Sequence, residues 1–236
     1  MRALLVPLSG LISGLSLCLL LDAGTRLLPY VLAGMLAISS KYVVKFRGKH
    51  FFNPTNFALA LILLTHLGSI TPGYQWGGGT TALWIALSMG GMILYRVKRM
   101  PLLFSFIGFF IVSAAVRAAL GHESLVLAFG LMTGAPFQLF TFFMLTDPRS
   151  TPNNPGTQVA FSAAVVLTDF ILRTIRIPNT LFLSLFIVDV VVLLTALLGW
   201  SFDVYAWNSS TVEVAPIKAL EDAASPRRGQ PAQTKP

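Results

Sequence analysis

Eight apolar segments follow one another along the chain, and they constrain its fold more than any other feature. A helix needs about 20 predominantly apolar residues to cross a bilayer, and these segments are about 15–21 residues long. Only 11% of the residues are charged and the mean hydropathy is +0.74, whereas a soluble domain carries roughly 25% charged residues. The sequence therefore predicts an all-α, polytopic membrane protein with about eight transmembrane helices. The segments cover residues 3–21, 27–45, 54–68, 80–95, 101–120, 124–145, 157–174 and 180–200.

These segments define one predicted transmembrane domain, residues 1–205. Several of them contain glycine, serine or proline, so we expect some helices to be tilted, broken or re-entrant. The first segment is longer than the core of a signal peptide and no small-x-small cleavage site follows it, so we expect it to remain as a membrane helix. Residues 206–236 are rich in proline, alanine, glutamine and charge, which predicts a disordered cytoplasmic tail.

Lysine and arginine predict the orientation, because they concentrate in cytoplasmic loops. With eight spans and a cytoplasmic N-terminus, 13 of the 17 Lys and Arg residues fall on the cytoplasmic side and four on the other. We therefore expect a multi-pass protein of the bacterial cytoplasmic (inner) membrane with both termini in the cytoplasm. The net charge of +8 comes from these loops rather than from a basic stripe interleaved with aromatics, so the lipid bilayer is expected as a partner and nucleic acid is not.

Cysteine and histidine limit the chemistry that the chain can perform. Cys18 is the only cysteine, which excludes intrachain disulfides and cysteine-ligated iron–sulfur clusters. The three histidines, His50, His66 and His122, lack the spacing of metal ligands, so no metal site is predicted. No phosphate loop, HExxH motif or assignable Ser–His–Asp set is present, and no catalytic residue is predicted. Whether the protein is an enzyme stays open. If it is one, we expect a redox-linked translocase subunit.

The stretch from Lys41 to Leu64 runs from a basic cluster through FFNPTNF into an apolar segment. That order is typical of a membrane helix entering the bilayer from its positively flanked side. Pro54 suits the first helical position and Asn53 the cap before it. Because Asn53 and Asn56 are three residues apart, both amides can lie on one helix face and form a ligand site. The alternative is that they only cap the helix.

Two pairs of stretches in the chain resemble each other. Ser13-Gly14 and Thr133-Gly134 each precede an apolar run that ends in Asp, and FFNPTNF and RIPNTLF each place Asn and Pro before an apolar helix. Five segments separate the copies, so the copies would have opposite orientations. Inverted repeats with broken helices and a site where they meet are a recurring membrane architecture, and we predict one here. The alternative is chance similarity between low-complexity membrane segments. The Ser/Thr-Gly steps are expected to mark close packing or a helix break.

Two long motifs resemble the signature stretches of the NqrB/RnfD family: SKYVVKFRGKHFFNPTNFAL and MTGAPFQLFTFFMLTDPRSTPNN. Members of this family are membrane subunits of the sodium-pumping NADH:quinone reductase and of the Rnf ferredoxin-linked complex. The resemblance covers residues 8–200. ISGLSLCLLL and GKHxFNPTNF are also similar to a branch of short, stand-alone members found with enediyne natural-product genes, the UnbU-like proteins. Relative to longer members the chain lacks two initial helices, so it is either a compact variant or starts late.

The resemblance implies two membrane flavins, of which we expect one. The family binds FMN covalently to a Thr within a Gly-Ala-Thr-Pro-Leu motif; Thr80 and Thr81 follow glycines but lack that context, so no covalent FMN is expected. The other family flavin is a noncovalent riboflavin held by the Asn-Pro stretch. Asn53 matches that pattern, whereas His50 stands where larger subunits tend to have Asn. We expect riboflavin or FMN, bound noncovalently. The predicted cofactor-binding residues are His50, Asn53, Asn56, Ser13, Gly14, Thr133, Gly134 and Asp147.

A flavin site also needs apolar walls beside its hydrogen-bonding groups. Phenylalanines near both motifs can supply them, although each ring can equally face lipid or pack in the core. Asp147 precedes Pro148 at a predicted helix end, so it is either a turn residue or a fixed anion that orients the ring or an entering cation. The phenylalanines are Phe51, Phe52, Phe57, Phe137, Phe140, Phe142 and Phe143.

Two further aspartates lie inside apolar segments, where ionisable groups are costly and are functional candidates. Asp169 is expected to pair with Arg173 one turn on. Asp189 has no obvious partner in the sequence, so it is the better candidate for contact with a proton or cation. Arg117 is expected to extend toward the membrane surface.

The sequence therefore predicts an electron-transport protein of NqrB/RnfD type that passes electrons to a partner, with coupled cation movement as a possible extension. Redox partner subunits or biosynthetic enzymes are the expected protein partners. Two alternatives stay open: a transporter of small, flavin-like solutes, because inverted repeats serve transport as well as redox chemistry, and a membrane scaffold for a biosynthetic partner.

Overall fold

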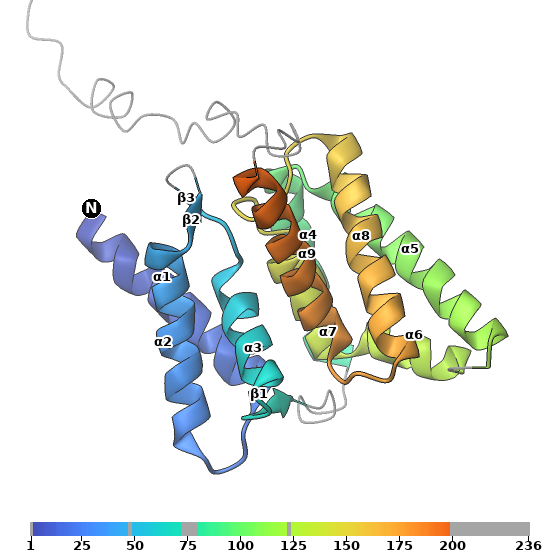
Figure 1. Cartoon of the computed structure of the whole chain (residues 1–236), viewed down its shortest axis with the longest axis horizontal. Helices are drawn as coiled ribbons and strands as arrows, with labels where there is room; N and C mark the ends of the chain where they lie inside the picture. Colours follow the sequence, from blue (N-terminus) through green and yellow to red (C-terminus); the bar gives the residue numbers. More distant parts are fainter. Residues whose placement is uncertain (1, 47–48, 72–79, 122–123, 199–236) are drawn as a thin grey trace, which may run out of the picture. The chain divides into compact units, whose positions relative to one another are not determined.

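The computed structural model describes residues 2–46, 49–71, 80–121 and 124–198, and the predicted tail at 206–236 lies outside them. The described chain is mostly helical, and each predicted apolar segment contains a helix or, at 124–145, a series of helical pieces (Figure 1). The helices are α1 (Arg2–Leu20), α2 (Leu27–Val43), α3 (Pro54–Leu64), α4 (Thr80–Val97), α5 (Met100–Ala119), α6 (Leu125–Thr133), α7 (Ala135–Leu139), the π-helix η2 (Phe140–Met144), α8 (Pro155–Thr174) and α9 (Thr180–Leu197).

Three of the described helices, α5, α8 and α9, are long and apolar enough to cross a membrane. They carry large apolar side chains on their outer faces, for example Phe104, Leu167 and Val191, as expected where a helix faces lipid rather than water. These features are compatible with a membrane protein. Four apolar helical stretches are shorter, including α3 with 11 residues. The eight spans expected from the sequence therefore stay a prediction.

Two antiparallel ladders of two residues per strand also form, and hydrophobic patterning did not predict them. β1 (Leu21–Asp22) pairs with β4 (Ser69–Ile70), and β2 (Lys45–Phe46) pairs with β3 (Lys49–His50). The first ladder ties the end of α1 to the segment after α3. Strands this short contain too few residues for an alternating pattern to be visible.

Buried apolar side chains from most of the described helices form one main core. Within it, α5 packs along α8, α8 along α9, α2 along α3, and α3 along α9. A chain of phenylalanine rings runs through the core, with Phe106 5.8 Å from Phe140 and Phe140 5.4 Å from Phe182. This packing holds α3 and the 135–147 region, which carry the two sequence motifs.

The segment predicted at 124–145 is interrupted after Thr133. Gly134 is extended (φ −71°, ψ 141°) and α7 begins beside Pro136. The nitrogen of Pro136 carries no hydrogen to donate to the carbonyl four residues earlier, and the proline ring clashes with that carbonyl, so α6 cannot continue through Pro136. The side chain of Gln138 donates to the carbonyl of Thr133 at 3.1 Å and satisfies a group that the break exposes.

The corresponding step in the first half behaves differently. α1 runs without interruption through Ser13 and Gly14. A Cβ added at Gly14 would meet no atom within 4 Å, so the expectation of a break or of close packing is wrong at this glycine. Asn53 and Asn179 both precede a helix, but only Asn53 caps it with its side chain. The inverted repeat therefore stays a prediction.

Candidate functional site at the start of α3

Asn53 connects the two sequence motifs. Its Oδ1 accepts hydrogen bonds from the backbone N–H groups of Thr55 and Asn56, both at 3.1 Å, and so caps α3. Its Nδ2 donates to Oδ2 of Asp147 at 3.2 Å and to the carbonyl of Phe143 at 3.5 Å. The amide therefore both caps the helix and contacts a residue 94 positions away.

Asp147 is a turn residue that also contacts the start of α3. Oδ1 accepts the backbone N–H of Arg149 at 3.0 Å, which is the contact of a turn residue. Oδ2 accepts from Asn53, so the carboxylate is also fixed against α3. The hydroxyl of Thr151 donates to the Asp147 carbonyl and tightens the same turn. The structure thus brings the start of α3 and the end of η2 into contact.

Asn56 lies in the first turn of α3 and is 1% exposed. Neither its Nδ2 nor its Oδ1 has a hydrogen-bond partner within the described part of the chain. Leaving a buried amide unsatisfied costs about 1–3 kcal/mol per group, and most such groups in native proteins are paired with protein or water. The Asn56 side chain takes no part in the cap that Asn53 forms, and its amide is a candidate for contact with a polar ligand or water.

Asp189 on α9 shows the same feature. It is 1% exposed, and its Oδ1 also lacks a hydrogen-bond partner among the residues that the structure describes. Asp189 interacts electrostatically with Asp147, so the two carboxyl groups belong to one neighbourhood. The sequence argument that Asp189 lacks a local partner agrees with this geometry. Its role toward a proton or cation stays a prediction.

Aromatic rings from α3 and α9 lie beside these polar groups. Phe186 is 5.7 Å from Phe52 and 5.8 Å from Phe57 between ring centroids, and Phe51 is 5.4 Å from Phe52. Sequence reasoning missed Phe186, because nothing in a run of apolar residues tells which side chain meets another helix. These rings can provide an apolar wall next to the start of α3.

The other predicted rings mostly pack in the core. Phe137 and Phe140 pack against Phe106 with their rings tilted. Phe142 lies so close to Gly90 that a Cβ there would be 2.6 Å from the ring. For these three phenylalanines the core-packing alternative is confirmed.

The remaining predicted cofactor residues divide into two groups. Ser13 accepts a hydrogen bond from Nζ of Lys41 at 3.0 Å, which joins α1 to the end of α2, and Gly14 follows it in α1. Thr133 donates to the carbonyl of Gly130 at 2.8 Å, and Gly134 forms the helix break. The features of Thr133 and Gly134 thus lie at the helix break before α7, whereas the hydrogen bond between Asn53 and Asp147 lies just after η2.

His50 in β3 is half-buried, and burial lowers the pKa of its imidazole below the usual value of 6.5. Asp147 opposes this shift, whereas the positive charges of Arg149 and Lys41 add to it. The folded protein therefore favours neutral His50. The stability that this contributes is present above the unfolded-state pKa and is lost as the pH falls through the lower folded-state pKa.

Replacing His50 by glutamine should consequently weaken the acid sensitivity of the fold. Between about pH 7.5 and pH 5.5, the Tm of the detergent-solubilised protein should fall in the wild type and fall less in His50→Gln. The matched control is His66→Gln, whose side chain is exposed and which should keep the wild-type dependence. Equal pH dependence of the Tm in His50→Gln and wild type would contradict the contribution of His50 to the acid sensitivity of the fold.

Asp169 is fully buried and fully paired. Its Oδ2 accepts from Nε of Arg173 at 2.8 Å, and its Oδ1 accepts from the hydroxyl of Thr180 at 2.5 Å. The predicted pairing with Arg173 is confirmed. The arrangement favours a structural role, in which the pair joins α8 to the start of α9.

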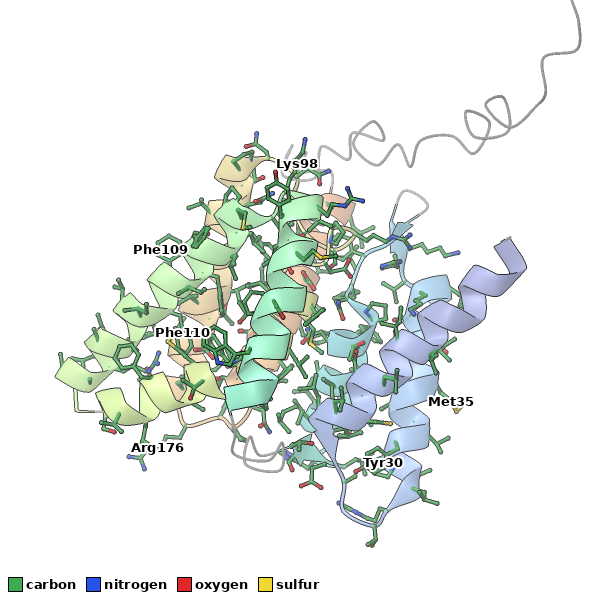
Figure 2. All side chains as sticks on the ribbon, turned by 180° about the vertical axis from the view of Figure 1, so that it is seen from behind. Tyr30, Met35, Lys98, Phe109, Phe110 and Arg176 are labelled. Carbon is green, nitrogen blue, oxygen red and sulfur yellow. The ribbon has the colours of Figure 1, made fainter. Side chains whose placement is uncertain are left out.

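Arg117 does not extend to the surface, so that expectation is wrong. It is 1% exposed, and its Nη1 donates to the hydroxyl of Ser113 at 2.5 Å. Its guanidinium lies 5.7 Å from the ring of Phe110, which is labelled in Figure 2. Arg173 lies 5.6 Å from the same ring. A guanidinium can pack on an aromatic face while it donates hydrogen bonds, and this compensates its burial.

Arg99 is a residue whose role the sequence did not reveal. It is 2% exposed, and its guanidinium donates to the carbonyls of Pro148, Thr151 and Pro152 and, at 2.5 Å, to Oδ1 of Asn153. It therefore holds the loop that begins at Asp147. In the sequence, the only indication of this role is the proline-rich loop that begins at Asp147, because the backbone carbonyls of such a loop lack partners within a helix or sheet.

In comparisons with known proteins, no model of a protein family matches the chain, and no curated protein is significantly similar to it. In the described ranges, no group of three or more His, Cys, Asp or Glu side chains is placed to hold a metal ion. A shallow, open hollow around Asp22, Arg26 and His66 lies away from Asn53, and its Asp22 carboxylate is engaged in a turn with Gly24.

Proposed function

We propose that the protein is a membrane electron-transfer protein that holds a noncovalent flavin, riboflavin or FMN, at the start of α3. The observation that carries the proposal is the buried amide of Asn56, which has no hydrogen-bond partner among the described residues and follows the Asn53–Asp147 contact in the chain. The resemblance of both motifs to the NqrB/RnfD family supports the same reading. A redox partner protein would deliver or accept the electrons.

The chemistry of the flavin ring fits these groups. One edge of the isoalloxazine offers two carbonyl oxygens and an N–H, and a carboxamide can both donate to and accept from such an edge. Oδ1 of Asp189, which has no hydrogen-bond partner in the described ranges of the chain, can accept from an N–H of the ligand or, when protonated, donate to a carbonyl. The rings of Phe52, Phe57 and Phe186 offer the apolar wall that a flavin needs.

The test is flavin binding by the purified full-length protein in mild detergent, followed by absorbance and by quenching of flavin fluorescence. Asn56→Leu should weaken flavin binding about tenfold or more, since one lost hydrogen bond of about 1.4 kcal/mol corresponds to a factor of ten. Asn154→Leu is the matched control: Asn154 is exposed and caps α8, so its loss should affect stability and leave flavin affinity unchanged.

Three outcomes decide between the candidate functions. Absence of flavin from folded protein, with none taken up on addition, removes the proposal. The break between α6 and α7 favours the transporter alternative, because discontinuous helices are common in transporters; uptake of riboflavin into proteoliposomes without redox activity would support it. If Asn56→Leu leaves the protein fully functional in its host, this result would support the alternative that the protein is a membrane scaffold without a ligand.

A further inference from the structure

A polar hollow lies where the connection between α1 and α2 meets the segment that follows α3. Side chains from both segments line it: Asp22, Thr25, Arg26, His66 and Ser69. Its volume is about 600 Å³, and sites for small ligands usually have about 300–1,000 Å³. Because α3 ends at Leu64, the hollow lies at the opposite end of that helix from Asn53.

Backbone contacts fix the walls of this hollow. β1 pairs with β4 so that Asp22 lies opposite Ser69. A Cβ added at Gly68 would lie 2.8 Å from a side chain of β1, so only glycine allows the two segments to approach this closely. The backbone N–H of Ala23 donates to the hydroxyl of Tyr30 at 3.2 Å, and Tyr30 is labelled in Figure 2. The hollow is therefore built from segments that are tied to one another.

One carboxylate and one guanidinium line the hollow, and their charges balance. Oδ1 of Asp22 accepts from the backbone N–H of Gly24 at 3.0 Å, and Nε of Arg26 donates to a backbone carbonyl at 3.4 Å. Among the residues that the structure describes, Asp22 and Arg26 form no ion pair with each other. Oδ2 of Asp22 and the terminal nitrogens of Arg26 can therefore contact a ligand. A ligand with both a positive and a negative group fits best, because Asp22 would repel a purely anionic one.

The headgroup of phosphatidylethanolamine carries both groups. Its ammonium can donate to the Asp22 carboxylate, and its phosphate can accept from the Arg26 guanidinium. The hydroxyls of Thr25 and Ser69 can donate to the same phosphate. A choline headgroup carries the same charges, but its quaternary ammonium has no N–H to donate. We propose that this hollow binds the zwitterionic headgroup of phosphatidylethanolamine.

Exposed leucines beside the hollow favour a lipid over a soluble molecule with the same headgroup. Leu27 and Leu28 directly follow Arg26 and are 78% and 64% exposed. Leu64, two residues before His66, is 54% exposed. Acyl chains attached to a headgroup in the hollow would cover such side chains, and burial of apolar surface would add to the affinity. This step rests on the predicted membrane location of the helices and not on flavin binding.

The test measures the Tm of the full-length protein in detergent micelles that contain increasing amounts of phosphatidylethanolamine, phosphatidylcholine or phosphatidylglycerol. Phosphatidylethanolamine should stabilise the wild type at the lowest mole fraction. Asp22→Asn and Arg26→Gln should each raise its midpoint about threefold or more, as expected for the loss of an exposed charge contact. Both variants should fold, because asparagine can still accept from Gly24 and because Arg26 is exposed. Arg176→Gln is the matched control, since Arg176 is exposed and does not line the hollow.

The three lipids and the variants give distinct outcomes. A preference for phosphatidylethanolamine in wild type and Arg176→Gln that is lost in Asp22→Asn and Arg26→Gln would support the site. Equal stabilisation by phosphatidylethanolamine and phosphatidylcholine, a preference for phosphatidylglycerol, or a preference that survives in both hollow variants would overturn it.

A soluble headgroup tests whether the acyl chains contribute. Glycerophosphoethanolamine, which lacks the chains, should stabilise the wild type only at much higher concentration than the lipid. Stabilisation at the same concentration would overturn the lipid as the ligand. Failure of the flavin test would not change these results, because Asn56 lies in the first turn of α3 and the hollow lies beyond its last turn.

Discussion

Replacing Arg99 by methionine is expected to lower the free energy of unfolding by about 3–5 kcal/mol. The guanidinium is buried and donates to three backbone carbonyls and to Asn153. Methionine fills much of the same volume but donates nothing, so the carbonyls of Pro148 and Thr151 lose the guanidinium, while the Pro152 carbonyl keeps only the hydrogen bond from Nε2 of Gln158 at 3.2 Å. The measurement is the Tm of the detergent-solubilised protein, supported by denaturant unfolding.

The same substitution should also reduce flavin affinity, because the loop held by Arg99 begins directly after Asp147. If Pro148 and Thr151 are released, the Asp147 carboxylate is no longer fixed against Asn53. Arg96→Met is the matched control, since Arg96 is exposed at the end of α4 and its loss should change the Tm little.

Arg99→Lys distinguishes charge from geometry. Lysine keeps the positive charge but presents one compact ammonium in place of a planar fork, so it cannot reach all four acceptors at once. We expect a loss of stability between those of Arg99→Met and wild type. A Tm for Arg99→Met equal to that of Arg96→Met would show that the loop does not depend on the guanidinium.

The parts of this fold that the sequence predicted are those decided by local chemistry. Pro54 and Asn53 mark the start of α3 because a fixed φ and a side-chain acceptor favour that position, and the structure places both there. The apolar segments correspond to helices or helical pieces, as the length and composition of each segment predicted. The pairing of Asp169 with Arg173 followed from their spacing of one helical turn.

What the sequence did not predict depends on partners that are distant along the chain. Arg99 could be recognised only as a loop charge, because its acceptors lie about 50 residues later. Phe186 joins the wall beside α3 through packing of α9, which no local pattern specifies. Arg117 was expected to extend outward, as a lone arginine does; Phe110 and Ser113 instead keep it buried. Long-range side-chain contacts are what a single sequence leaves undetermined.

Replacing Arg173 by methionine is expected to cost about 3–5 kcal/mol, because it leaves the Asp169 carboxylate buried without its cation. Asp169 is 0% exposed, and it would keep the hydrogen bond from the hydroxyl of Thr180 at 2.5 Å. A single hydroxyl does not replace a guanidinium as the partner of a buried carboxylate. The measurement is again the Tm in detergent, and Arg176→Met serves as the matched control because Arg176 is exposed (Figure 2).

The double variant Arg173→Met with Asp169→Leu should be more stable than Arg173→Met alone. Removing both charges takes away the uncompensated carboxylate, and an apolar pair of similar volume often replaces a buried ion pair at little cost. Recovery of most of the lost Tm would show that the penalty arises from the unpaired charge rather than from lost packing around Phe110. If the double variant is as unstable as the single one, the Asp169–Thr180 contact, rather than the ion pair, joins α8 to α9.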